Sequence, residues 1–121
     1  MPIQKILVVD DSPTERLFLL EVLSLQGYEV ALAMNGNEGI ATARTMQPDL
    51  ILMDVVMPDM NDFEATRTLH NDPATQHIPI IMCTTKGQET DKIWGLRQGA
   101  VDYLVKPLDP DVLLSKIAAF P

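Results

Sequence analysis

The stretch Ile6-Leu7-Val8-Val9-Asp10-Asp11-Ser12-Pro13-Thr14-Glu15 predicts a buried strand that runs directly into a helix. Its four branched apolar residues follow one another without alternation, which is typical of a strand covered on both faces in a parallel sheet. Ser12 suits the N-cap, Pro13 suits the first helical position, and Glu15 stands where a capping box needs an acid. The stretch therefore predicts one strand-helix unit with two carboxylates at the junction.

The same pattern recurs four more times along the sequence. We expect strands at 28–33, 50–54, 78–84 and 101–105, and helices at 37–46, 62–71, 89–98 and 109–119. The second strand alternates in polarity and carries Glu29, which predicts a sheet edge. The apolar face of the first helix is assigned to Leu17, Leu20, Leu23 and Leu25, with Gly27 as its stop. Five strand-helix pairs predict one α/β domain over 1–121, with helices on both faces of a parallel sheet.

Composition narrows the class of protein. The 121 residues fit one domain, and a net charge of −8 argues against sequence-independent nucleic-acid binding, which needs clustered cations. The single cysteine, Cys83, lies in an apolar run, cannot form an intramolecular disulfide and is consistent with a reducing compartment. The apolar runs are too short to insert into a membrane, and the N-terminus lacks a leader pattern. We therefore expect a cytoplasmic protein.

Chemical groups gather at the predicted strand ends. Asp10 and Asp11 end the first strand, Asp54 the third, Thr84 the fourth and Lys106 the fifth. Open parallel sheets bind ligands at this edge. Carboxylates about 5 Å apart repel by roughly 3 kcal/mol per pair at an effective dielectric of about 20. Three pairs approach roughly 10 kcal/mol, as much as a domain's stability. One lysine offsets only part of this, so the pattern favours a hard divalent cation such as Mg²⁺.

The same groups suit phosphoryl chemistry. A carboxylate is a nucleophile toward phosphorus, and a lysine ammonium neutralises phosphoryl oxygens as a point charge. A threonine hydroxyl can donate a hydrogen bond to a phosphoryl oxygen, and a loop carbonyl can complete a metal site. The strand ends therefore predict a site for a metal and a phosphoryl group together.

At these residues a family resemblance emerges. Residues 9–12, 52–58 and 103–107, together with Thr84, resemble the receiver domains of response regulators in two-component systems. The resemblance implies the CheY-like, flavodoxin-like (βα)5 fold with strand order 2-1-3-4-5. It further implies the following roles: Asp54 as phosphoacceptor, Mg²⁺ held by Asp10, Asp11, Asp54 and the backbone carbonyl of Val56, Lys106 paired with the phosphoryl group, Thr84 and Tyr103 as a switch pair, and a cis peptide bond between Lys106 and Pro107.

The segments 11–15, 84–95 and 97–100 are more narrowly similar to PilH-type regulators of type IV pilus twitching motility. This resemblance implies a CheA-like sensor histidine kinase as phosphoryl donor. It also implies a protein target on the face formed by the fourth helix, fifth strand and fifth helix. We expect a monomer or weak dimer with no output domain, no nucleic-acid partner and no enzymatic turnover.

Several alternatives stay open at this point. Taken alone, Asp10 and Asp11 suit a helix cap, Tyr103 suits the core, and Trp94 suits either the core or a partner surface equally well. At the level of function, the alternatives are a phosphorylation-independent interaction module and a phosphate sink. An aspartate-dependent phosphatase is disfavoured because Val56 stands where those enzymes place a second acid.

One position departs from the family pattern. Asp62 stands where receiver domains usually carry a glycine, and a positive φ there would strain an aspartate. Asp62 also adds a carboxylate near the predicted site. We therefore expect a backbone cost in this loop.

Overall fold

The computed structural model describes residues 3–55, 60–85 and 99–120. Its elements in chain order are β1 Lys5–Val9, α1 Pro13–Leu25, β2 Glu29–Ala33, α2 Gly36–Met46, β3 Leu50–Val55, α3 Met60–Asn71, β4 Ile80–Thr85, β5 Asp102–Lys106 and α5 Pro110–Ala118. The helix expected at 89–98 lies outside the described residues. Within these ranges, no helix combines the length and the apolar character that crossing a bilayer requires.

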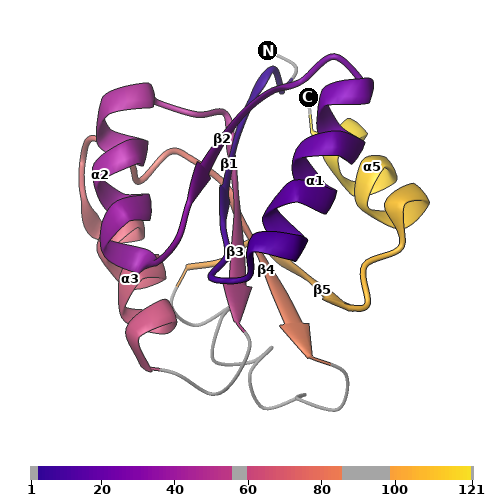
Figure 1. Cartoon of the computed structure of the whole chain (residues 1–121). Helices are drawn as coiled ribbons and strands as arrows, with labels where there is room; N and C mark the ends of the chain where they lie inside the picture. Colours follow the sequence, from indigo (N-terminus) through magenta and orange to yellow (C-terminus); the bar gives the residue numbers. More distant parts are fainter. Residues whose placement is uncertain (1–2, 56–59, 86–98, 121) are drawn as a thin grey trace.

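The five strands form one parallel sheet in the order β2-β1-β3-β4-β5, as the family resemblance implied. The arrowheads of β3 and β4 mark the carboxyl-terminal edge in Figure 1. The prediction of β2 as an edge strand is confirmed. β1 and β3 are central neighbours, and β2 and β4 lie on their outer sides, so the strand order reverses between β1 and β3.

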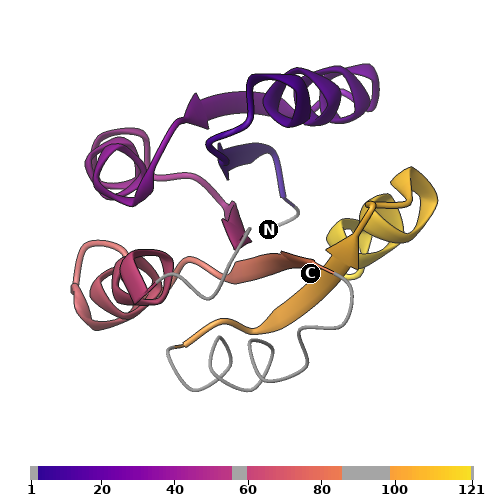
Figure 2. The same cartoon turned by 60° about the horizontal axis from the view of Figure 1, so that its bottom comes forward.

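Helices cover both faces of the sheet. Figure 2, which turns the carboxyl-terminal edge forward, shows α2 and α3 on one face and α1 and α5 on the other. Side chains alternate between these layers. In β1, Leu7 and Val9 belong to the core with α2 and α3, while Ile6 and Val8 belong to the core with α1 and α5. This double burial explains why the central strands read as continuous apolar runs.

The N-cap of α1 is as predicted, but the return bond of the capping box is replaced, because the Ser12 backbone N–H donates to Asp10 Oδ1. The apolar face of α1 also differs from the prediction. Ser12 is the N-cap, and its Oγ accepts a hydrogen bond from the Glu15 backbone N–H at 3.3 Å. The buried residues of α1 are Leu19 and Leu23. The assignment of Leu17 and Leu25 to the apolar face was wrong, because they are 63% and 77% exposed. Each lies two positions, or about 200°, from a buried leucine and therefore faces solvent.

Other element boundaries shift by one or two residues. β5 begins and ends one residue later than expected, so Lys106 is its last residue. α2 begins at Gly36 because the Asn35 side chain accepts a hydrogen bond from the Glu38 backbone N–H at 2.9 Å and caps the helix. α3 begins at Met60, two residues early, which places Asp62 inside its first turn. The expected strain at Asp62 was therefore wrong, since a helical residue has negative φ.

Candidate functional site

Three acidic side chains meet at the carboxyl-terminal edge between β1 and β3. The strands are in register at Val9 and Met53, so the next residues, Asp10 and Asp54, lie side by side. One carboxylate oxygen from each of Asp10, Asp11 and Asp54 lies within 4.8 Å of the other two. Asp10 and Asp54 are buried, whereas Asp11 is exposed. The predicted cluster is thus assembled, with one member open to solvent.

Asp10 is fixed from four directions. Its backbone N–H donates to the Ala33 carbonyl at 3.0 Å, which extends the β1–β2 pairing by one residue. Its carboxylate accepts from the Ser12 backbone N–H at 2.9 Å through Oδ1 and contacts Lys106 Nζ at 3.3 Å through Oδ2. Its backbone carbonyl accepts from Arg16 Nη1 at 2.8 Å. The junction between β1 and α1 is therefore held by backbone and side chains together.

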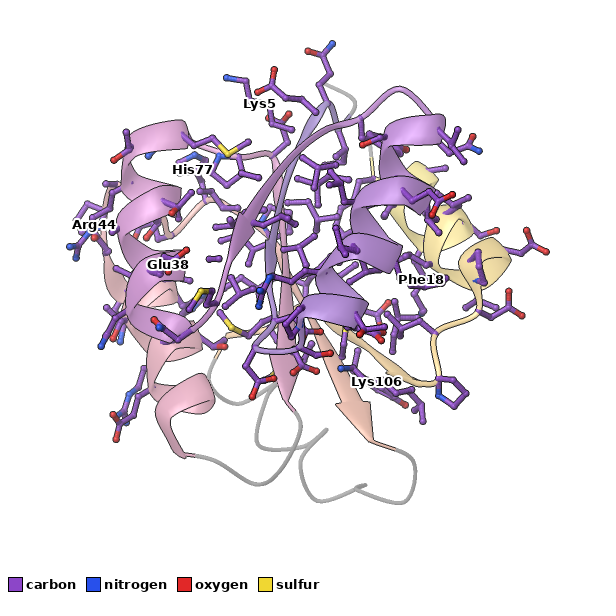
Figure 3. The ribbon with its side chains drawn as sticks, in the orientation of Figure 1. Lys5, Phe18, Glu38, Arg44, His77 and Lys106 are labelled. Carbon is purple, nitrogen blue, oxygen red and sulfur yellow. The ribbon has the colours of Figure 1, made fainter. Side chains whose placement is uncertain are left out.

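Lys106 joins this cluster from the end of β5. Its ammonium forms ion pairs with Asp10 and with Asp54, and its side chain is 19% exposed. Figure 3 shows Lys106 at the carboxyl-terminal edge, below α1. Burial alone would lower the pKa of Lys106, but the hydrogen bond and the charge of Asp54 outweigh burial and raise it. Lys106 therefore stays charged and offsets part of the acidic cluster.

Asp54 carries the strongest electrostatic perturbation of the site. Its burial raises its pKa from 3.8 to about 7, and the charges of Asp10 and Asp11 add to this effect. The hydrogen bond and the charge of Lys106 act in the opposite direction without cancelling the rise. The ionised form of Asp54 is thus less favoured than that of an ordinary aspartate, and a further positive charge would favour it.

The donor set fits a hard divalent cation. All candidate ligand atoms are carboxylate oxygens, which Mg²⁺ prefers over nitrogen or sulfur. A cation would also relieve the repulsion from Asp10 and Asp11, which adds to the effect of burial on the pKa of Asp54. The backbone carbonyl of Val56, expected as a further ligand, lies outside the described residues, as do residues 57–59.

The remaining predicted residues lie on β4 and β5. Thr84 stands in register with Val55 and Val105, and its side chain is outside the described part of the structure. Tyr103 is partly buried against the core that lies under α2 and α3. The peptide bond from Lys106 to Pro107 is cis. The backbone thus places Thr84 on the strand between Asp54 and Lys106, as their order in the sheet requires.

Sequence reasoning missed two neighbours of the acidic cluster. Cys83 is in register with Asp54 on the adjacent strand and is fully buried, which raises the pKa of its thiol to about 12. Pairing the predicted third and fourth strands in parallel would have indicated that Cys83 lies beside Asp54. Arg16 reaches back from α1 to Asp10. Nothing in its sequence context distinguishes it from a solvated arginine on a helix.

Comparisons with known proteins agree with this geometry. Protein PilH of Pseudomonas aeruginosa is 55% identical over 115 residues, covering 95% of each chain. Response regulator PleD of Caulobacter vibrioides is 42% identical over 113 residues, covering 93% of this chain but 25% of PleD. The chemotaxis protein CheY4 of Vibrio cholerae superposes with a TM-score of 0.86 at 36% identity, covering 95% and 96% of the two chains.

A further solved structure bears on the acidic cluster. The receiver domain of a Pseudomonas aeruginosa sensor histidine kinase, solved with a magnesium ion coordinated in its active site cleft, has a TM-score of 0.84 at 31% identity, covering 94% of this chain and 93% of that one. The family model of the response regulator receiver domain matches residues 6–118. With its order of five parallel strands and its acidic edge, this chain therefore belongs to the response regulator receiver domain family.

Proposed function

We propose that Asp54 accepts a phosphoryl group from a sensor histidine kinase, and that this event controls contacts with a protein target. The observation that carries the proposal is the meeting of Asp54 with Asp10, Asp11 and Lys106 at one edge of the sheet. Family membership supports the same role, since a receiver domain is the part of a response regulator that takes up the signal.

The chemistry assigns a step to each residue. A carboxylate oxygen of Asp54 attacks the phosphorus of a phosphohistidine, a P–O bond forms, and the P–N bond breaks as the histidine nitrogen leaves. The product is an acyl phosphate on Asp54. Lys106, already at this carboxylate, pairs with the added negative charge as a point charge. Burial of Asp54 limits water around the reacting oxygen.

Asp10, Asp11 and Asp54 are proposed to hold Mg²⁺, which when bound supplies positive charge to the phosphoryl oxygens. Asp10 is buried and fixed by its hydrogen bonds, so it presents a preformed ligand. Asp11 is exposed and suits a ligand that takes up an ion from solvent. The Val56 carbonyl and the Thr84–Tyr103 switch pair complete the proposal as the family resemblance implies them.

The proposal extends to a signalling pathway. The 55% identity to PilH over nearly the full length of both proteins supports a role in signalling linked to type IV pilus motility, with a CheA-like kinase as donor. We place this exchange in the cytoplasm. The proposed target surface includes β5 and α5, where Asp102, Val112, Lys116 and Phe120 line a groove of about 580 Å³. Phosphoryl transfer is then a switch and not a turnover reaction.

Labelling of the purified protein tests the proposal. With acetyl phosphate and Mg²⁺, the wild-type chain is expected to incorporate one phosphoryl group, and Asp54→Ala is expected to incorporate none. Asp72→Asn is the matched control, because it removes a carboxylate that pairs with Arg44 outside the acidic cluster. Labelling of Asp54→Ala at the wild-type level, or labelling that does not require Mg²⁺, would overturn the proposal.

A further inference from the structure

Arg16 binds a backbone carbonyl beside the acidic cluster. It lies in the second turn of α1, is half-buried, and its Nη1 donates to the backbone carbonyl of Asp10 at 2.8 Å. The salt bridges among the described residues involve Arg44, Lys106 and Lys116, and Arg16 takes part in none of them. Its guanidinium therefore bonds the backbone at the junction and forms no salt bridge with the carboxylates of the cluster.

The carbonyl that Arg16 holds belongs to the turn that presents two of the three acids. Asp10 follows the last residue of β1, and Asp11 and Ser12 lead into α1 at Pro13. The Ser12 backbone N–H binds the Asp10 carboxylate, so both ends of Asp10 are fixed by residues of the same junction. A charge-assisted hydrogen bond to a carbonyl is stronger than a neutral one, which suits a fixed turn.

We propose that Arg16 is a positioning residue for the divalent-cation site. By holding the Asp10 carbonyl, it sets the direction in which Asp10 and Asp11 present their carboxylates toward Asp54. This inference rests on the proposed function, because it concerns the affinity of the same site for Mg²⁺. Residues that orient metal ligands without contacting the metal commonly contribute to affinity, and their removal weakens metal binding by about 10- to 100-fold.

The charge of Arg16 and its hydrogen bond act on Mg²⁺ affinity with opposite sign. A positive charge near the cluster repels a divalent cation, so its removal alone would tighten Mg²⁺ binding. Loss of the hydrogen bond would loosen the turn and weaken Mg²⁺ binding. The direction of the measured change therefore separates a positioning role from a purely electrostatic one.

Calorimetric titration with MgCl₂ tests the inference on Arg16→Gln, which removes both the charge and the guanidinium fork. We expect its Kd for Mg²⁺ to rise about tenfold or more. Arg16→Lys is expected to fall between wild type and Arg16→Gln, because an ammonium can donate to the carbonyl without the planar fork. Arg44→Gln is the charge-matched control with an unchanged Kd, since Arg44 lies on the outer side of α2 and pairs with Asp72 (Figure 3).

Phosphoryl acceptance supplies a second readout. In Arg16→Gln the Mg²⁺ concentration for half-maximal labelling is expected to rise by the same factor, while the labelling rate at saturating Mg²⁺ stays near that of wild type. A Kd equal to or tighter than wild type overturns the inference. If Arg16→Gln does not fold in EDTA, Arg16→Lys replaces it, and a wild-type Kd for that variant overturns the inference. A wild-type chain that binds no Mg²⁺ overturns the proposed function itself.

Discussion

Replacement of Asp54 by asparagine is expected to stabilise the metal-free protein at neutral and alkaline pH. Asparagine keeps the size of the side chain but carries no charge. The side chain of Asp54 is 5% exposed, and burial together with Asp10 and Asp11 raises its pKa to about 7 in spite of Lys106. The folded protein therefore holds an ionised Asp54 only at a cost in unfolding free energy.

The size of this cost follows from the pKa difference. The pKa of Asp54 is 3.8 in the unfolded chain and about 7 in the folded chain, a difference of about 3 units. Each unit corresponds to about 1.4 kcal/mol, so the contribution reaches about 4 kcal/mol. Between pH 3.8 and about pH 7, the folded state binds more protons than the unfolded state. Stability from Asp54 is hence fully present below pH 3.8 and is lost as pH rises to about 7.

Urea unfolding followed by circular dichroism in EDTA measures this effect, from about pH 4 to about pH 8.5. The quantity to compare is the unfolding free energy of wild type minus that of Asp54→Asn, so that the other carboxylates cancel. This difference is expected to fall with pH and to recover when Mg²⁺ is added. Asp72→Asn is the control, and the unfolding free energy of wild type minus that of Asp72→Asn is expected to rise with pH. The reason is that the Ala74 backbone N–H and Arg44 lower the pKa of Asp72. A difference for Asp54 that is flat or rises with pH would refute the reasoning.

Three further predictions concern other residues. Lys106→Gln removes the group that lowers the pKa of Asp54, so the pH at which acetyl phosphate labelling reaches half its maximum is expected to rise. Ser12→Ala removes the cap of α1 and is expected to lower the unfolding free energy by about 1 kcal/mol, measured by urea unfolding. Gly39→Ala places a Cβ 2.8 Å from Val9 Cγ2 and is expected to cost about 1–3 kcal/mol, with part of that cost recovered in the double variant with Val9→Ala.

The strands and the acidic cluster were predictable from the sequence for a shared physical reason. Continuous apolar runs indicate strands buried on both faces, and parallel strands bring their carboxyl ends to one edge. Asp10, Asp54 and Lys106 could be placed together on that basis without any contact being known. The strand order itself came from the family resemblance, because periodicity does not fix which strands are neighbours.

Other features were beyond the sequence because they depend on rotation and packing. The exposed Leu17 and Leu25 show that leucine count does not define a helix face, since position around the axis decides burial. The start of α3 at Met60, two residues before the predicted start at 62, places Asp62 within the first turn, where its backbone has negative φ. The contact of Arg16 with a carbonyl has no sequence signal, because any half-buried arginine can reach several acceptors.

The alternation of side chains along the strands sets a rule for how this chain can vary in length. Asp10, Asp54 and Lys106 stand two positions after Val8, Leu52 and Leu104, which all lie in the core beneath α1 and α5. One inserted residue within β3 or β5 would shift this two-residue alternation of side chains by one position. Asp54 or Lys106 would then point toward the layer that contains α2 and α3. The same insertion in a connecting loop leaves the alternation of side chains along each strand unchanged. Insertions and deletions are therefore expected to be confined to the connections, while strand lengths stay fixed.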